Sequence, residues 1–287
     1  MAYGLLEDEE AHAMKSVTAE ALKLRYEPVS VVLTDEKPGN AVEFKKGKFG
    51  CVMALLSAAS RGKQAVASRE TVTCPGGRTG LGFGNQFENL PGGVDIFCRF
   101  LSVGNEGYEP GMQITDMMKP FVTEEIYDNF KYGERYLKTP ELVRKYIDCL
   151  PITDVPFEYV VFRPLSDVDP EQEKPEVVVF LADMDQLSAL VVLANYDRDT
   201  NESVIIPQAA GCQSIGIYPF EEARSQTPRA VVGLVDITAR VQVKRQLKSD
   251  LMSFAVPFAM FLEMEGNVPG SFLERSTWKE LMKLKDQ

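Results

Sequence analysis

The segment best suited to chemistry reads Cys-Pro-Gly-Gly-Arg, from Cys74 to Arg78. It follows the β-rich run Val66–Thr73, and its proline and glycines end a strand in a tight turn. We expect a short helix over Thr79–Phe83 to open from this turn. Free backbone N–H groups and the Arg78 guanidinium would then face the Cys74 sulfur, in surroundings that stabilise a thiolate. The alternative is an ordinary glycine turn in which Cys74 is a small buried hydrophobic residue.

The chain has five cysteines and one histidine, so its options for chemistry are narrow. The cysteines are Cys51, Cys74, Cys98, Cys149 and Cys212. An odd number scattered over a long chain makes a poor disulfide framework, so reduced thiols are expected. The single histidine, His12, nearly excludes Ser-His-Asp, Cys-His and multi-histidine metal sites. Chemistry must therefore depend on cysteine, carboxylates, Lys, Arg, Tyr or a bound cofactor.

Cys51 precedes Val52–Ser60, a small apolar run that predicts a buried helix. The dipole of such a helix favours an anionic sulfur at its start. A buried structural cysteine is the simpler interpretation. Cys212 stands in a comparable place, before a helix expected over Gln213–Ala223.

Two parts of the chain echo each other around these cysteines. In both, Gly-Cys is followed by a helix and then by Ala-Val, and eight positions separate Val66 from Cys74 and Val231 from Ala239. If the two halves are a divergent duplication, Cys51 and Cys212 are related by a pseudo-two-fold and approach each other near Cys74. Ala239 would then replace a fourth thiol. Chance similarity of two strand-helix units is the alternative.

The composition indicates a globular protein with a substantial core. Of its 287 residues, 45% are hydrophobic and 25% charged. The formal net charge of -11 disfavours binding to nucleic acid or to anionic membranes. No signal peptide or membrane span is evident, so we expect a cytoplasmic protein.

Strand and helix patterns alternate along the chain, which predicts an α/β fold with a layered mixed sheet flanked by helices. We expect a single domain, or two closely packed halves at about 27–150 and 151–265 with helices at both termini. Expected strands, besides the run before Cys74, are Val29–Thr34, Phe157–Phe162, Val177–Leu181, Ser203–Ile206, Ala230–Ile237 and Met252–Val256. Further expected helices are Glu9–Tyr26, Val94–Leu101, Pro140–Cys149, Asp185–Asn195, Pro257–Met264 and Thr277–Lys285. The Met- and aromatic-rich stretch 114–136 is expected to cover an apolar surface.

Several of these residues together resemble the domain of unknown function 169 family, a group of uncharacterised archaeal and bacterial proteins. They are Pro28-Val29, Cys51, Cys74-Pro75-Gly76-Gly77, the stretch Tyr136–Pro151 and Gly211-Cys212. The similarity runs from about Val29 to Phe261. It implies that Cys51, Cys74 and Cys212 belong to the family pattern, whereas Cys98 and Cys149 are incidental.

Three functions fit these observations. In the first, Cys51, Cys74 and Cys212 bind an iron–sulfur cluster or a soft metal and leave one position open, although the chain lacks a CxxC pair. In the second, Gly76, Gly77 and Arg78 bind a small molecule or an anion without catalysis. In the third, Cys74 is the nucleophile or redox thiol of an enzyme. The sequence leaves open whether the protein is an enzyme, what its ligand is, and its oligomeric state.

Overall fold

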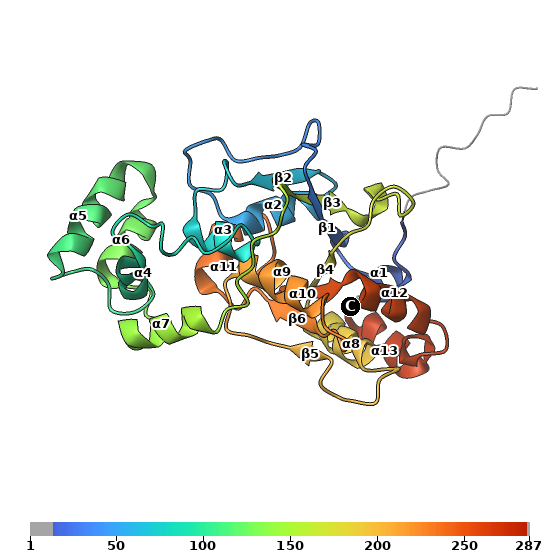
Figure 1. The fold of residues 1–287 in the computed structure, drawn as a ribbon. Coiled ribbons are helices and arrows are strands. Elements are labelled where there is room, and N and C mark those ends of the chain that lie inside the picture. The colour runs from blue at the N-terminus through green and yellow to red at the C-terminus, as the bar shows by residue number, and fades with distance from the viewer. Residues whose placement is uncertain (1–13, 286–287) are drawn as a thin grey trace, which may run out of the picture.

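The centre of the molecule is a seven-stranded mixed sheet in the order β2-β3-β1-β4-β7-β6-β5. The coordinates are a computed structural model that describes residues 14–285 (Figure 1). All neighbouring strands are antiparallel except β5 and β6. The strands are β1 (Val29–Thr34), β2 (Ala65–Ser68), β3 (Tyr159–Pro164), β4 (Val177–Ala182), β5 (Val204–Ile205), β6 (Ala230–Gly233) and β7 (Met252–Pro257). The predicted α/β class is confirmed.

Helices cover both faces of the sheet, because alternate residues of each central strand are apolar on opposite sides. In β4, Val177 and Val179 face one hydrophobic cluster, and Val178 and Phe180 face another. The first face is covered by α2 (Val52–Ala59), α3 (Pro75–Gly80), α9 (Gly211–Ile215), α10 (Ile217–Glu222) and α11 (Ile237–Val243). The second is covered by α1 (Val17–Ala21), α8 (Met184–Ala194), α12 (Phe258–Asn267) and α13 (Ser276–Lys285).

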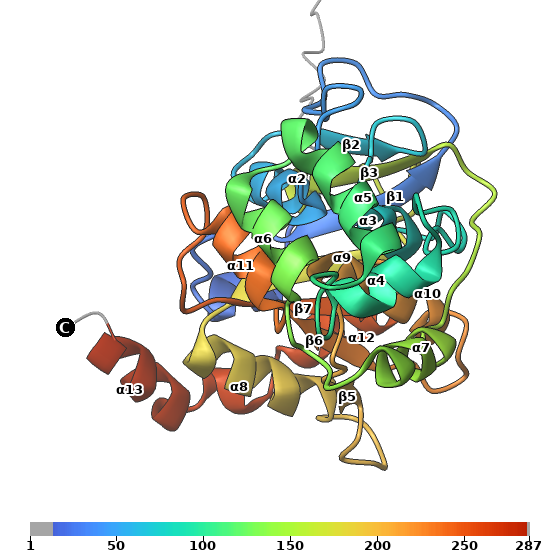
Figure 2. The same ribbon diagram turned by 90° about the vertical axis from the view of Figure 1, so that its left-hand side faces the viewer.

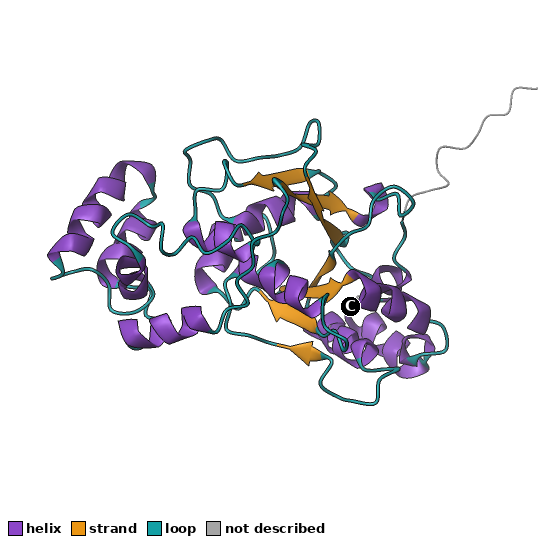
Figure 3. Cartoon of the chain, in the orientation of Figure 1, coloured by secondary structure: helices purple, strands orange, loops and turns teal. Residues whose placement is uncertain are grey.

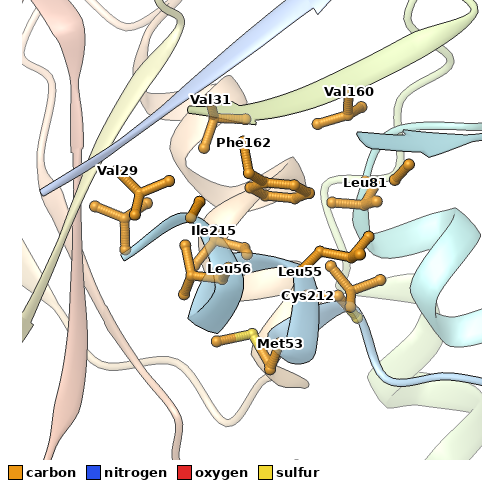
Figure 4. Packing of buried hydrophobic residues seen from close by; sticks show 14 of the residues in the cluster. Val29, Val31, Met53, Leu55, Leu56, Leu81, Val160, Phe162, Cys212 and Ile215 are labelled. Atoms are coloured by element: carbon orange, nitrogen blue, oxygen red, sulfur yellow. The ribbon is translucent and has the colours of Figure 1, made fainter. Parts of the chain in front are cut away.

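The α2 helix packs into the centre of the first face. Leu55 and Leu56 lie between it and Phe162 of β3 and Ile215 of α9, and Met53 lies farther from Phe162, as Figure 4 shows. All five side chains are fully or almost fully buried. This packing fixes the start of α2, and Cys51 with it, against the sheet. Three short 3₁₀ helices complete the secondary structure of residues 14–285: Lys119–Phe121, Leu165–Asp167 and Phe272–Glu274.

The strand order repeats. The sheet contains two similar sets of three strands, β2-β3-β1 and β6-β7-β4, and neighbouring strands within each set are antiparallel. The two sets meet where β1 pairs antiparallel with β4. Two related halves would give this order, so the topology agrees with the repeat in the sequence. The boundary between halves near residues 150 and 151 stays a prediction.

A helical insertion, residues 94–148, stands between α3 and β3. It consists of α4 (Val94–Phe100), α5 (Glu109–Met118), α6 (Glu124–Tyr132) and α7 (Pro140–Asp148). Figures 1 and 2 show its first three helices in front of α3, α9 and α11, away from the sheet. Its core includes stacked rings of Phe100 and Phe130, with centroids 4.3 Å apart. The aromatic stretch therefore covers an apolar surface, as predicted.

Figure 3 shows the helices and strands of the structure, and several expected elements differ from them. The N-terminal helix is limited to α1 among the described residues, and His12 lies outside them. The helix expected over 213–223 is interrupted at Gly216, where α9 ends and α10 begins. The strand expected over 230–237 ends at Gly233, because Leu234 has a positive φ of 59° and Asp236 caps a new helix, α11.

The N-cap of α7 offers a simple test of how much a capping residue predicted from the sequence stabilises the fold. The Leu142 N–H donates to Thr139 Oγ1 at 3.3 Å, with Pro140 in the first turn. Thr139→Ala should therefore lower the free energy of unfolding by about 1 kcal/mol, and Thr139→Ser should retain most of it. Urea unfolding of the two variants measures this difference. Equal midpoints for Thr139→Ala and the wild type would show that the cap contributes nothing.

Candidate functional site

A cavity of about 530 Å³ lies between the helical insertion and the helices on the first face of the sheet. Its walls are mainly apolar and include Phe49, Phe97, Phe100, Leu101, Phe130 and Leu137. Its polar groups are contributed by the starts of helices on the sheet side and by the chain that follows α6. The size and lining are those of a small-molecule site.

Four helices begin at this cavity with a thiol or a carboxyl group at the N-cap or in the first positions. Cys51 is the N-cap of α2, Cys74 the N-cap of α3 and Asp236 the N-cap of α11, while Cys212 is the second residue of α9. All four line the cavity. The three cysteines singled out in the sequence thus come together, whereas Cys98 is buried in the insertion and Cys149 is exposed at the end of α7.

Cys74 and Cys212 are held by the same peptide unit. The Gly77 N–H donates to Cys74 Sγ at 3.4 Å, and the Cys212 thiol donates to the Gly76 carbonyl oxygen at 3.3 Å. The C=O and N–H of a trans peptide point in opposite directions, so the two sulfurs occupy opposite sides of this unit. Helix α3 starts at Pro75, whereas the sequence predicted a start at Thr79. Because of this earlier start, the Gly77 N–H donates to the Cys74 sulfur.

The α3 and α9 helices approach closely at a glycine. A Cβ on Gly80 would lie 2.7 Å from Cys212 Sγ and 2.9 Å from the Gln213 backbone nitrogen. Only a glycine allows this distance, so Gly80 sets the position of Cys212 relative to the Cys74 turn.

Burial keeps the three thiols protonated. It raises the pKa of Cys51 to about 12 and also raises the pKa of Cys74 and of Cys212. Asp236 adds to all three shifts, neighbouring thiols add to those of Cys51 and Cys212, and Glu134 adds to that of Cys74. Hydrogen bonds from Gly76 and Gly77 to Cys74 act in the opposite direction but are outweighed. The predicted lowering of the Cys74 pKa is therefore wrong, because burial outweighs the turn amides. Arg78 does not line the cavity and is not among the groups that shift the pKa of Cys74.

Alkylation rates should distinguish the three cavity thiols from the exposed thiol of Cys149. Because the thiolate is the nucleophile, iodoacetamide at pH 8 should modify Cys149 at least about tenfold faster than Cys51, Cys74 or Cys212. Peptide mapping over a time course gives the four rates. A Cys74 rate equal to that of Cys149 would show an activated thiolate.

The iron–sulfur or soft-metal hypothesis is not supported by the arrangement of side chains. Within residues 14–285, no group of three or more His, Cys, Asp or Glu side chains is placed to hold a metal ion. Cys51, Cys74 and Cys212 all line one cavity. Metal binding through them stays a prediction.

A hydrogen-bonded chain joins the insertion to α11 at the cavity. The Thr238 hydroxyl donates to Glu134 Oε1. The Tyr136 hydroxyl lies 2.9 Å from Thr238 Oγ1 and accepts the Thr238 N–H at 2.8 Å. Burial raises the pKa of Glu134 to about 7.

Asp236 joins α11 to α9. Its Oδ1 accepts the Ala239 N–H at 3.1 Å, and its Oδ2 accepts the Gly211 N–H at 3.4 Å. Asp236 caps the helix that follows β6, and Cys74 caps the helix that follows β2. In the repeat, Asp236 rather than Ala239 therefore corresponds to Cys74. The pattern Asp236-Ile237-Thr238 is a helix-start signal that could have located it.

Fold and cavity together define an α/β protein with a helical insertion that covers an apolar ligand-sized pocket. The chain belongs to the DUF169 family, described as uncharacterised ArCR, whose model matches residues 19–267. No curated protein and no solved structure matches the chain. Among the helices formed by residues 14–285, none has the length and apolar character needed to cross a lipid bilayer.

Proposed function

We propose that this protein binds an apolar small molecule in the cavity between the helical insertion and the α/β body. The observation that carries the proposal is the cavity itself, about 530 Å³ in volume, apolar along its walls and polar at the helix starts. Such a distribution holds a ligand by apolar burial and orients it through a few polar groups.

Gly76 and Gly77 line the cavity, whereas Arg78 does not. The missing side chain of Gly76 leaves space for a ligand. A Cβ there would meet only Cys74 Sγ, at 3.9 Å, whereas a Cβ on Gly77 would lie 3.1 Å from Val72 and 3.2 Å from Val52. Gly76 is therefore the position at which a side chain can be added to fill the cavity.

A fluorescence titration tests the proposal with N-phenyl-1-naphthylamine, a neutral dye that brightens in apolar surroundings. The wild type and Gly76→Ala should bind the dye saturably with one site, and Gly76→Phe should weaken binding at least about tenfold because its ring occupies the space. Circular dichroism checks that both variants are folded. Lack of saturable binding by the wild type, or equal affinity of a folded Gly76→Phe, would reject the proposal.

The second candidate is an iron–sulfur cluster or soft metal on Cys51, Cys74 and Cys212, favoured by the single observation that all three line one cavity. Thiolate sulfur is the ligand that such centres require. Anaerobic reconstitution with iron and sulfide, followed by a visible spectrum, tests it. A colourless wild type, or equal colour in Cys74→Ser and in the exposed control Cys149→Ser, would remove this candidate.

A further inference from the structure

Among residues 14–285, the charged side chains that line the cavity are both acidic. They are Glu134 and Asp236, and no Lys, Arg or His of this part of the chain lines it. Three thiols stand beside them, and the chain as a whole carries a formal net charge of -11. A bound anion would have no cationic partner and would face these acids. At the helix starts, the Gly77, Gly211 and Ala239 N–H groups already donate to Cys74 and Asp236. The side-chain charges therefore favour a neutral or cationic ligand.

The two carboxyl groups differ in what they can offer to a ligand. Both oxygens of Asp236 accept backbone N–H groups, from Ala239 and from Gly211. The Glu134 carboxyl uses one oxygen, Oε1, which accepts from Thr238 and, at 3.4 Å, from Asn129 Nδ2. Its other oxygen, Oε2, receives no hydrogen bond from the part of the chain that the structure describes. Glu134 is thus the carboxylate with an acceptor left for a ligand.

Aromatic side chains line the same cavity as this carboxylate. The Glu134 N–H donates to the Phe100 carbonyl oxygen at 2.8 Å, and the Tyr136 hydroxyl reaches the same Thr238 that Glu134 binds. Phe97 and Phe100, with ring centroids 5.9 Å apart, and Tyr136 line the same cavity. Aromatic faces attract cations within about 6 Å of the ring centre, most strongly away from water.

We propose that the ligand of this cavity is an organic ammonium ion, an amine or quaternary ammonium with apolar substituents. Its charge lies at Glu134 and its apolar part lies against Phe97 and Phe100. This inference rests on the proposed small-molecule function and adds the charge class of the ligand. Rings and carboxylate act together, because the carboxylate provides the counter-charge and the rings exclude water from the pair.

Three dyes of different charge test the inference at pH 8. They are the cationic 4-(4-dimethylaminostyryl)-N-methylpyridinium, the neutral N-phenyl-1-naphthylamine and the anionic 1-anilinonaphthalene-8-sulfonate. The wild type should bind the cationic dye at least about tenfold more tightly than the anionic one. Glu134→Gln should weaken binding of the cationic dye at least about tenfold more than binding of the neutral dye.

Glu125→Gln is the matched control, because Glu125 is exposed on α6 and does not line the cavity. It removes the same charge and should leave the affinities for all three dyes unchanged. Equal weakening of the cationic dye by Glu125→Gln and Glu134→Gln, or anionic binding as tight as cationic binding, would overturn the inference. If the neutral dye binds and the cationic dye does not, the small-molecule function stands and only the charge class is wrong. If neither binds, both proposals fail.

Discussion

Replacing Gly216 by alanine is expected to lower the free energy of unfolding by about 3 kcal/mol, because the added methyl group meets backbone on two sides. Its Cβ would lie 2.1 Å from the Gly80 carbonyl oxygen and 3.1 Å from the Cys212 carbonyl oxygen. Neither oxygen can move without shifting α3 or α9. The substitution should therefore also disturb the turn that holds Cys74 and weaken binding of N-phenyl-1-naphthylamine.

Gly266→Ala is the control for this prediction. Gly266 lies in α12, and a Cβ there would meet nothing within 4 Å. Alanine restricts the unfolded chain more than glycine does, so Gly266→Ala should raise stability by about 0.5 to 1 kcal/mol. Urea unfolding of both variants gives the comparison. A Gly216→Ala midpoint at or above that of the wild type would mean that α3 and α9 are not in close contact.

The second large effect is a pH dependence of the free energy of unfolding that is caused by Glu134. Burial raises the pKa of this carboxyl from 4.5 to about 7. The folded protein therefore holds the proton more tightly than the unfolded chain does. The resulting stabilisation is fully present below pH 4.5 and is lost as the pH rises through 7. The size of the shift corresponds to about 3 kcal/mol.

Glu134→Gln removes this titration while its amide oxygen can still accept the Thr238 hydroxyl. The variant and the wild type should have similar free energies of unfolding at pH 4, and the variant should be more stable by up to about 3 kcal/mol at pH 8. The neighbouring titratable groups Asp236, Tyr136 and Cys74 are present in both proteins. Urea unfolding between pH 4 and 8 gives the difference. A difference that does not change with pH would show that the carboxyl is not buried as described.

Elements with strong local signals were predictable from the sequence. The strand β1 matches the expected Val29–Thr34 residue for residue, because an apolar β-branched run is bounded by breakers. The helix α7 begins after Thr139 as expected, since cap and proline both mark its start. Elements governed by distant contacts were not predictable. The break at Gly216 exists because Gly80, far away in sequence, lies against it.

The candidate site also combines features that were predictable from the sequence with features that depend on distant contacts. The repeat around Cys51 and Cys212 indicated that three cysteines gather, and they line one cavity. Glu134 was not predicted because only the folded insertion brings it to Thr238. The direction of the Cys74 pKa shift could not be predicted from the sequence either, because it depends on how far the effect of burial exceeds that of the turn amides.

The most direct test of a small-molecule function is a crystal structure of the protein with N-phenyl-1-naphthylamine at saturating concentration. We expect density for the dye inside the cavity, against Phe97 and Phe100, with one end toward Cys74 and Cys212. Dye density at another surface, or an empty cavity at saturation, would contradict the proposed function.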